Sequence, residues 1–495
     1  MKGKVYHTKL GPYDITFFLL LFCIVSLFWL FPYPAIVDAP QHATQLRILE
    51  QIIQGDPFYE ERFWINWFTP YIFPNLILVV VAYLFSPLIA IKSAITFYLV
   101  TFSIIGRALV HHFDKPKPTQ LLCLCFLYTP ALYWGFIPFL VSISIGAIWF
   151  YLLITNRIGI KSTISLTFSL LLMFSHAIGW AILTYNVISL HFLKNGFSKK
   201  SILNTIPILA PAILIIGWFF YFTSNEVSAT EIKGLIYGSP VGKLVTMLFS
   251  ILGDNIRYLS IIKVLIITII FSKYIEFIKT KNDVAIIILL NLVLYFALPG
   301  IIFSTAYIDI RALPIALLIL PLTISKIANV RLFNICAFTM IFISMTSITL
   351  NQFTIHREIN SYHKATSSIA LDSDVFYISK LEDLGDFKLN VQSVPLFIHF
   401  PHWLSSSKTI NIDYNFSIVH NIMLRTNNKN YPWNGQVSYS YARFQWNSIK
   451  TYNYDYIIIR NCNMDEDELS KIVKESSFTA LSSVDCWKTF KNPQI

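Results

Sequence analysis

The sequence predicts a mainly α-helical protein, a polytopic transmembrane bundle of about 11–12 spans followed by a small extracytoplasmic α/β domain. Of the 495 residues, 55% are hydrophobic and only 13% are charged, whereas soluble domains carry about 25% charged residues. Apolar runs of spanning length recur as far as residue 350, and beyond Asn351 polar residues become common. We therefore divide the chain into a membrane module, 1–350, and a C-terminal domain, 351–495.

The N-terminal segment sets the orientation of the predicted bundle. Three lysines precede the first apolar run, which predicts a cytoplasmic start. No small-residue cleavage site follows that run, so we interpret 14–34 as a span and not as a removed signal peptide. The next segment, 35–69, becomes the first outer loop. Its first half, 41–53, has apolar residues at helical spacing, which predicts an amphipathic helix.

The basic loop that follows the next two apolar segments decides how many of them cross the membrane. Tyr71–Ala90 and Ile91–Val110 are both apolar, and a basic loop, 111–117, follows them. Two full spans would place that loop outside, although basic loops stay on the cytoplasmic side. Pro74 and Pro87 also interrupt the first segment, and Pro70 directly precedes it. We therefore predict that Tyr71–Ala90 lies in, or re-enters, the outer leaflet, with a full span as the alternative.

The formal net charge of +11 does not indicate nucleic-acid binding. Lys and Arg occupy short loops between spans, as the positive-inside rule produces. No basic stripe with interleaved aromatic residues occurs on a polar segment. The charge pattern therefore excludes nucleic acid as a partner and supports membrane lipids.

Several short elements are predicted in the C-terminal domain. Asp374–Ile378 and Tyr454–Ile459 have strand patterns, Asp465–Glu475 has a helix pattern, and 478–490 predicts a closing strand pair. Cys462 and Cys486 are the only cysteines of this domain. They would form a disulfide in an oxidising compartment, but spacing alone leaves their pairing open.

The candidate catalytic group is Asp38, directly after the first span. A carboxylate near the mouth of a span is costly unless it is paired or functional. It would accept a proton from a hydroxyl group or hold a divalent cation beside a phosphate. The alternative is that Asp38 only caps the helix that Pro40 begins. His42 would assist Asp38, and Arg47 would neutralise phosphate charge or anchor a lipid headgroup.

Three further residues are predicted on the same side of the membrane. His176 lies where two short apolar runs meet, and is either a substrate-binding group or a histidine bonded inside the bundle. Asp309 and Arg311 share a tight outer turn. Arg311 would bind a lipid-linked phosphate, unless the two residues form a local ion pair. Glu231 is a weaker candidate for a second carboxylate.

Other chemistry has little support in the sequence. His399 and His402 lack cysteine or carboxylate companions, so we interpret them as structural or acceptor-docking residues and predict no protein metal site. The sequence has no P-loop, GxGxxG, HExxH or GxSxG motif. ATPase, dehydrogenase, zincin and serine-hydrolase functions therefore lack their usual signatures.

This layout resembles the GT-C superfamily of polyprenyl-phosphate-dependent membrane glycosyltransferases. Those enzymes have a first outer loop with an acidic residue, many further spans and an extracytoplasmic C-terminal domain, and Asp38 stands at the acidic position. Many members have an acidic pair there, but Ala39 follows Asp38 in this chain. The second outer loop, 133–138, also lacks an aspartate, which weakens the expectation of a metal-dependent mechanism. The chain also resembles uncharacterised bacterial multipass proteins with an Asp-x-Pro-x-His first loop and a Gly-Phe-x-x-Phe turn.

The resemblance implies a hexosyl- or pentosyltransferase of the bacterial inner membrane with a periplasmic C-terminal domain. It implies a polyprenyl-phosphate sugar donor and a lipid or surface-glycan acceptor. A divalent cation, Mg²⁺ or Mn²⁺, stays an open alternative. Two rival functions are a lipid-linked saccharide transporter or flippase and a non-catalytic envelope-assembly protein. A transporter predicts polar residues deep in several spans, where this sequence has few.

Overall fold

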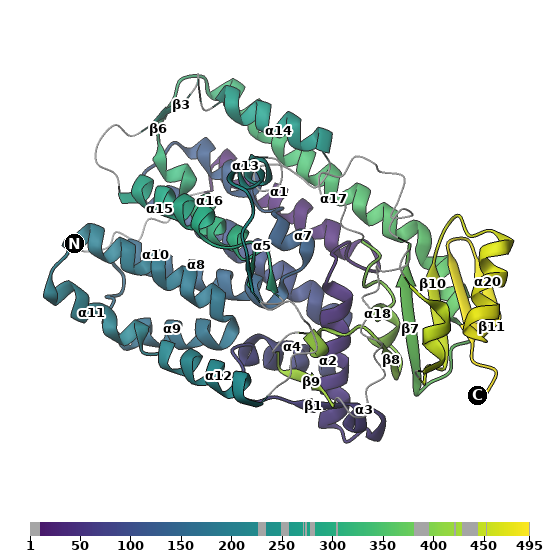
Figure 1. The fold of residues 1–495 in the computed structure, drawn as a ribbon. Helices are drawn as coiled ribbons and strands as arrows, with labels where there is room; N and C mark the ends of the chain where they lie inside the picture. The colour runs from purple at the N-terminus through teal and green to yellow at the C-terminus, as the bar shows by residue number, and fades with distance from the viewer. Residues whose placement is uncertain are drawn as a thin grey trace.

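The computed structural model describes residues 10–225, 234–248, 257–270, 272, 275–277, 283–302, 305–380, 396–419, 422–427, 444–451 and 453–494. Glu231 lies outside these residues. Helices pack side by side in the membrane module, and the C-terminal sheet lies at one end of the molecule (Figure 1). The longer helices of the module are α1 (Pro12–Trp29), α4 (Ile72–Leu84), α5 (Pro87–His112), α8 (Ile137–Ile154), α9 (Thr163–Ser175), α10 (Ala177–Asn195), α11 (Lys199–Leu209), α12 (Ala212–Asn225), α14 (Arg257–Ile269), α15 (Asp283–Ala297) and α17 (Val330–Thr366).

The predicted polytopic membrane bundle is confirmed. Among the described residues, four helices are long and apolar enough to cross a bilayer, namely α1, α5, α8 and α17, and four shorter apolar stretches accompany them. In α1, Phe17, Leu21 and Ile24 face the protein, while Leu19 and Phe22 are exposed. Both faces are apolar because one packs on protein and the other meets lipid. Helix α8 is largely buried and lies inside the bundle.

The segment predicted to re-enter the membrane forms two helices. Helix α4 has 13 residues and ends before Phe85. It is about 20 Å long, which is less than the roughly 30 Å of a hydrocarbon core. The Ser86 hydroxyl accepts a hydrogen bond from the Ile89 N–H, and α5 begins at Pro87. The short helix is compatible with a re-entrant segment, which stays a prediction.

Two apolar segments that the sequence predicts as single spans, Thr119–Tyr133 and Arg311–Ile327, are interrupted in the structure. The first contains η1 (Lys117–Leu121), α6 (Leu122–Cys125) and α7 (Pro130–Trp134). The second contains η4 (Asp309–Ala312), α16 (Leu313–Ile319) and η5 (Leu320–Thr323). Prolines at 130 and 321 begin new turns, because proline cannot donate a helical backbone hydrogen bond. Every residue of α16 is buried. These segments are apolar because protein surrounds them.

The first outer loop folds as α2 (Ala39–Ile53), α3 (Pro57–Arg62) and β1 (Phe63–Ile65). Helix α2 confirms the predicted helix, but polar residues on it, including Gln41, Thr44 and Gln45, are buried as well. Their burial follows from the C-terminal domain, whose α18 (His402–Ser405) packs on α2. In Figure 1, α2 and α18 lie close together near the middle of the molecule.

The C-terminal domain contains a five-stranded mixed sheet in the order β11-β12-β10-β7-β8. Its strands are β7 (Ser373–Ser379), β8 (Ile410–Ile412), β10 (Tyr456–Arg460), β11 (Thr479–Val484) and β12 (Trp487–Lys491). Strand β7 is parallel to both β8 and β10, and β12 is antiparallel to β10 and β11. Helix α20 (Glu466–Ser476) begins after Asp465, whose carboxylate accepts a hydrogen bond from the Glu468 N–H. The predicted strands, helix and closing pair are confirmed.

The C-terminal domain and the first outer loop share a sheet and an ion pair. Strand β1 pairs antiparallel with β9 (Leu424–Thr426), so that Phe63 lies opposite Thr426. Arg62 donates two hydrogen bonds to Asp374, with Nε–Oδ1 and Nη2–Oδ2 distances of 3.2 and 2.8 Å. Helix α17 continues past residue 350 to Thr366 and carries the chain into the domain (Figure 1). The two parts of the chain are therefore joined along a continuous contact.

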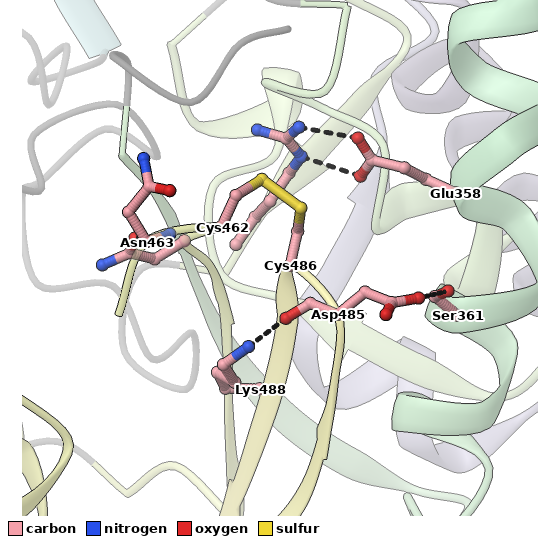
Figure 2. Close-up of a disulfide and its surroundings, with 9 residues drawn as sticks. Glu358, Ser361, Cys462, Asn463, Asp485, Cys486 and Lys488 are labelled. Carbon is pink, nitrogen blue, oxygen red and sulfur yellow. Dashed lines mark hydrogen bonds and ion pairs between the residues drawn. A yellow bond between two sulfur atoms is a disulfide. The ribbon is translucent and has the colours of Figure 1, made fainter. Parts of the chain in front are cut away.

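A disulfide joins Cys462 and Cys486. Figure 2 shows it at the end of the sheet that meets α17, near Glu358 and Ser361. Arg460 donates to both carboxylate oxygens of Glu358, and the Ser361 hydroxyl donates to Asp485. The pairing that the sequence left open is thus present, and it braces the strand ends that rest on the long helix.

Replacing Arg62 with Ala should loosen the C-terminal domain. The Asp374 carboxylate would keep its bond to Asn411 but lose its buried charge partner, a loss of about 2–3 kcal/mol. We expect a lower unfolding temperature in detergent and faster limited proteolysis between the sheet and the bundle. Glu60→Ala is the matched control, because Glu60 is exposed on the same short helix, whereas Glu61 lies 3.9 Å from Arg62. Equal behaviour of the two variants would contradict the assigned role of Arg62.

Candidate functional site

Backbone hydrogen bonds fix the position of Asp38. The N–H groups of Val37 and Asp38 donate to the carbonyls of Tyr133 and Trp134, at 3.1 and 2.9 Å. Asp38 occupies the N-cap position of α2, but its side chain makes no capping hydrogen bond. The carboxylate is therefore held at the N-terminus of α2 but does not cap this helix.

Gly135 permits the close approach of these two loops. Its φ angle is +83°, and a Cβ at this position would lie 2.5 Å from Ile36 Cγ2 and 3.3 Å from the backbone nitrogen of Asp38. Any side chain would also strain the left-handed backbone. The Gly135-Phe136 turn therefore packs closely against the loop that carries Asp38.

The Asp38 side chain is buried. Only 8% of the residue is exposed. Burial raises the pKa of the carboxyl well above its usual value, and the positive charge of Arg311 opposes this rise. The nearest charged or titratable neighbour is His399 of the C-terminal domain, with 3.6 Å between Nε2 and Oδ1. An ionised Asp38 therefore depends on the groups around it.

Arg311 is a buried cation without a carboxylate partner among the residues that the structure describes. It lies in η4 and is 4% exposed. Its guanidinium stacks over Phe136 at 4.5 Å, Nη2 donates to the Ala306 carbonyl at 3.4 Å, and Nε has no partner. Burial lowers the pKa of Arg311 to about 10, against the effects of Tyr71 and Asp38. The guanidinium stays charged at neutral pH and retains an unused donor.

His176 faces Arg311 from the start of α10. Its Nδ1 accepts a hydrogen bond from the Gly179 N–H at 3.1 Å, which places the proton of the neutral ring on Nε2. That Nε2 lies 3.3 Å from Arg311 Nη1. Burial and the charge of Arg311 hold the pKa of His176 well below its usual range. Because Nδ1 is the accepting nitrogen, the protonated Nε2 cannot accept from Arg311, and an anionic oxygen bound between the two groups would give both donors an acceptor.

Tyr307 lies in the same region, although the sequence did not single it out. It has a left-handed backbone with φ +59°, and its ring contacts Trp134 with 4.7 Å between centroids. Burial and the charges of Asp38 and Asp309 raise the pKa of Tyr307 to about 12. Its phenol is therefore neutral at physiological pH. A non-glycine residue in this conformation points to a local constraint at the site.

Asp309 is turned toward Lys243 and not toward Arg311. The Lys243 Nζ lies 3.4 Å from Asp309 Oδ2 and donates to the carbonyls of Tyr295 and Leu298. Burial raises the pKa of Asp309, and Lys243 opposes the rise. The local ion pair considered for Asp309 and Arg311 is therefore absent, and each has different partners.

The remaining first-loop candidates lie at different distances from the site. His42 hydrogen-bonds the backbone of Gly135 and contacts the Phe416 ring, and burial lowers its pKa to about 4. Arg47 lies nine residues beyond Asp38, about 13 Å along the helix. It pairs with Glu50 at 3.2 Å. The structure therefore brings His42, but not Arg47, to the loop that holds Asp38.

The donor set around Asp38 is small for a divalent cation. No group of three or more His, Cys, Asp or Glu residues that could hold a metal occurs among the described residues. Asp38 and His399 together offer one carboxylate and one imidazole, whereas Mg²⁺ prefers six oxygen ligands. These residues alone do not fit Mg²⁺ or Mn²⁺, and we derive no step from a metal.

Comparisons with known proteins identify the fold of this chain. No protein-family model matches the chain, and no curated protein sequence matches it significantly. The chain resembles the crystal structure of ArnT from Cupriavidus metallidurans bound to undecaprenyl phosphate, with a TM-score of 0.52 and 10% identity over 97% of both chains. The chain has a GT-C fold. The GT-C fold and the apolar helices make it an integral membrane protein. Because the identity is low, this likeness concerns the fold alone.

Several site residues were not identified from the sequence. Gln41, Tyr71, Lys243 and Tyr307 gave no signal, because each is an ordinary polar or aromatic residue in its segment. His399 was interpreted as structural, since its partner Asp38 lies more than 350 positions away. Asp309 and Arg311, two ionisable residues in one short outer turn, were the signal that pointed to this turn.

Substitution of Gly135 with Ala should disturb the Asp38 loop more than backbone strain alone. Gly55→Ala is a matched control, because Gly55 also has a positive φ (+79°) but no atom within 4 Å of a Cβ. We expect Gly55→Ala to cost about 1 kcal/mol and Gly135→Ala clearly more, because of the added clash. Unfolding temperatures of the two purified variants measure the difference. An equal loss in both would show that the close approach carries no energetic weight.

Proposed function

We propose that the chain transfers a sugar from a polyprenyl-phosphate donor to a lipid or glycan acceptor at the outer face of the inner membrane. The observation that carries the proposal is that Asp38 and Arg311 are both buried ionisable groups that form no salt bridge with each other, and that Arg311 Nε has no hydrogen-bond partner. Left unpaired, such charges would be costly in a protein interior. A substrate that bears both a hydroxyl group and a phosphate would use both.

In the proposed reaction Asp38 is the general base. It accepts the proton of the acceptor hydroxyl while that oxygen forms a bond to the anomeric carbon of the sugar. The bond between the anomeric carbon and the donor phosphate oxygen breaks, and its electron pair leaves with the phosphate. Attack from the face opposite the phosphate inverts the anomeric centre. Base catalysis of this kind contributes about 10²–10⁴-fold to a rate.

The donor phosphate would bind at Arg311. The free Nε of Arg311 and the facing N–H groups of Arg311 and His176 are donors for phosphate oxygens. The aromatic residues Phe136 and Tyr71 exclude water there, which strengthens the electrostatic attraction. A bound polyprenyl phosphate in ArnT, which has the same fold, supports this assignment.

The rival transport function has weaker support in the described spans. Asn186 and Asn291 lie on α10 and α15 but bond each other, at 2.5 and 3.1 Å. Lys263 on α14 donates to Ser344 at 2.8 Å. These polar groups tie helices together and do not form an open path of unsatisfied groups. A candidate site at the end of the spans, and not a polar path through them, therefore favours chemistry over transport.

Asp38→Asn should abolish transfer and leave the phosphate site intact. We expect at least a hundred-fold loss of glycolipid product in cells, because the amide cannot accept the proton. Arg311→Lys should instead weaken binding of undecaprenyl phosphate in nanodiscs by about tenfold or more, because lysine lacks the planar donor fork. Arg157→Lys, on an exposed inner loop, is the control. A normal glycolipid profile with Asp38→Asn, where deletion of the protein changes it, would refute the proposed reaction.

The disulfide provides a test of the proposed periplasmic side. In an oxidising compartment Cys462 and Cys486 should resist maleimide labelling in whole cells until they are reduced. The double variant Cys462→Ser/Cys486→Ser, whose four other cysteines are reduced, gives the background. We expect loss of the protection in a strain without periplasmic disulfide oxidation. Free thiols in the wild-type strain would place the domain on the cytoplasmic side.

A further inference from the structure

A segment of the C-terminal domain lies directly against the candidate base. His399 is 5% exposed and approaches Asp38 with 3.6 Å between Nε2 and Oδ1. Its ring also stacks on Tyr414 and packs edge-on against Phe416. The imidazole is therefore held in one orientation by residues that come from the C-terminal domain.

The Gln41 side chain lies beside the Nδ1 atom of His399. The Gln41 side-chain oxygen accepts the Phe416 N–H at 3.2 Å, so its nitrogen faces the histidines. That nitrogen donates to the Tyr414 carbonyl at 2.8 Å and lies 3.3 Å from His399 Nδ1. Donation from Gln41 to Nδ1 leaves the proton of the neutral ring on Nε2, which is the atom that faces Asp38.

His402 fits the same arrangement. Its Nε2 lies 2.8 Å from the Tyr414 carbonyl and donates to it, while its Nδ1 has no partner. The Gln41 nitrogen also lies 2.9 Å from His402 Nε2, so its second N–H is close to both histidines. Because His402 Nε2 carries the proton that it donates to Tyr414, it cannot accept from Gln41, and His399 Nδ1 is the nearby acceptor for that N–H.

We propose that His399 is a positioning residue that keeps the Asp38 carboxylate ionised and oriented, so that the C-terminal domain completes the active site. The inference rests on the proposed function of Asp38 as a base. An N–H group that donates to a carboxylate favours its charged form. At 3.6 Å the contact is long, and it would shorten when substrate draws the carboxylate to its hydroxyl group.

Other titratable groups face the same carboxylate or its partner. Arg311 and Tyr307 approach Asp38 from the η4 side, and His42 is on α2 itself. His402 and Tyr414 adjoin His399 from the C-terminal domain. Arg311 keeps its charge and His42 stays neutral at physiological pH, so neither replaces the N–H that His399 supplies.

The sign of the expected effect follows from the direction of donation. Loss of the Nε2–H donor removes an interaction that is stronger with the charged carboxylate than with the neutral carboxyl, so the pKa of Asp38 rises. Because the contact is 3.6 Å in the substrate-free protein, this rise should be smaller than the roughly 1–2 units that a full charge-assisted hydrogen bond gives. The acid limb of the activity profile should move to higher pH by the same amount.

The test is a pH titration of the full-length protein in nanodiscs, followed by the infrared band of the protonated carboxyl. Asp38→Asn identifies the band that belongs to Asp38. His399→Phe keeps the ring stacked on Tyr414 but removes the donor, and His399→Ala is a second variant without it. His399→Gln retains an amide N–H. His363→Gln is the matched control, because His363 is exposed on α17 and its ring contacts Tyr33 and Tyr362 and not Asp38 or Gln41.

We expect the Asp38 band to titrate at higher pH in His399→Phe and His399→Ala, to return toward the wild-type midpoint in His399→Gln, and to stay unchanged in His363→Gln. An unchanged midpoint, or no Asp38 band, in a folded His399→Phe or His399→Ala protein would overturn the inference. If the midpoint shifts but Asp38→Asn leaves the glycolipid profile normal, the proposed function fails and the positioning of Asp38 by His399 stands.

Discussion

The arrangement depends first on a backbone contact between two outer loops. The N–H of Asp38 bonds the carbonyl of Trp134 at 2.9 Å, and Gly135 leaves no side chain between them. This contact sets the position of the carboxylate without using the carboxylate itself. Because backbone hydrogen bonds hold the loop in place, the Asp38 side chain is not needed for this contact and stays available for chemistry. The same turn supplies Phe136, on which Arg311 stacks, so one constraint locates both charges.

The second feature is a polar core between the bundle and the C-terminal domain. Buried Gln41, His402 and the Tyr414 carbonyl satisfy one another, and the Thr44 hydroxyl donates to the His402 carbonyl at 2.6 Å. Buried polar groups are costly unless nearly all of them are bonded, so such a network tolerates few alternative arrangements. Apolar packing would hold the domain equally well but would fix it less specifically. Here the network fixes the rotation of His399 relative to Asp38.

The sequence predicted the membrane bundle, the helix after Asp38 and the main strands of the C-terminal domain, because each produces a local pattern. Prediction from the sequence failed where the surroundings of a segment, and not its local pattern, determine its structure. The apolar run Leu313–Ile319 resembles part of a span because it is buried in protein, and lipid and protein interior select the same side chains. In the site, Asp38, His176 and Arg311 were named because ionisable groups at membrane edges are unusual. Gln41 and His399 could not be recognised, since their roles arise only when distant segments meet.

The pairing of β1 with β9 has a consequence for the order of assembly. Phe63 is made early in synthesis and its partner Thr426 near the end, so almost the whole chain must be inserted before this ladder can close. The loop that carries Asp38 therefore lacks its contact with the C-terminal domain while the helices enter the bilayer. A chain that ended after the membrane module would contain Asp38 and Arg311 but not His399. The domain that is made last would therefore complete the candidate site.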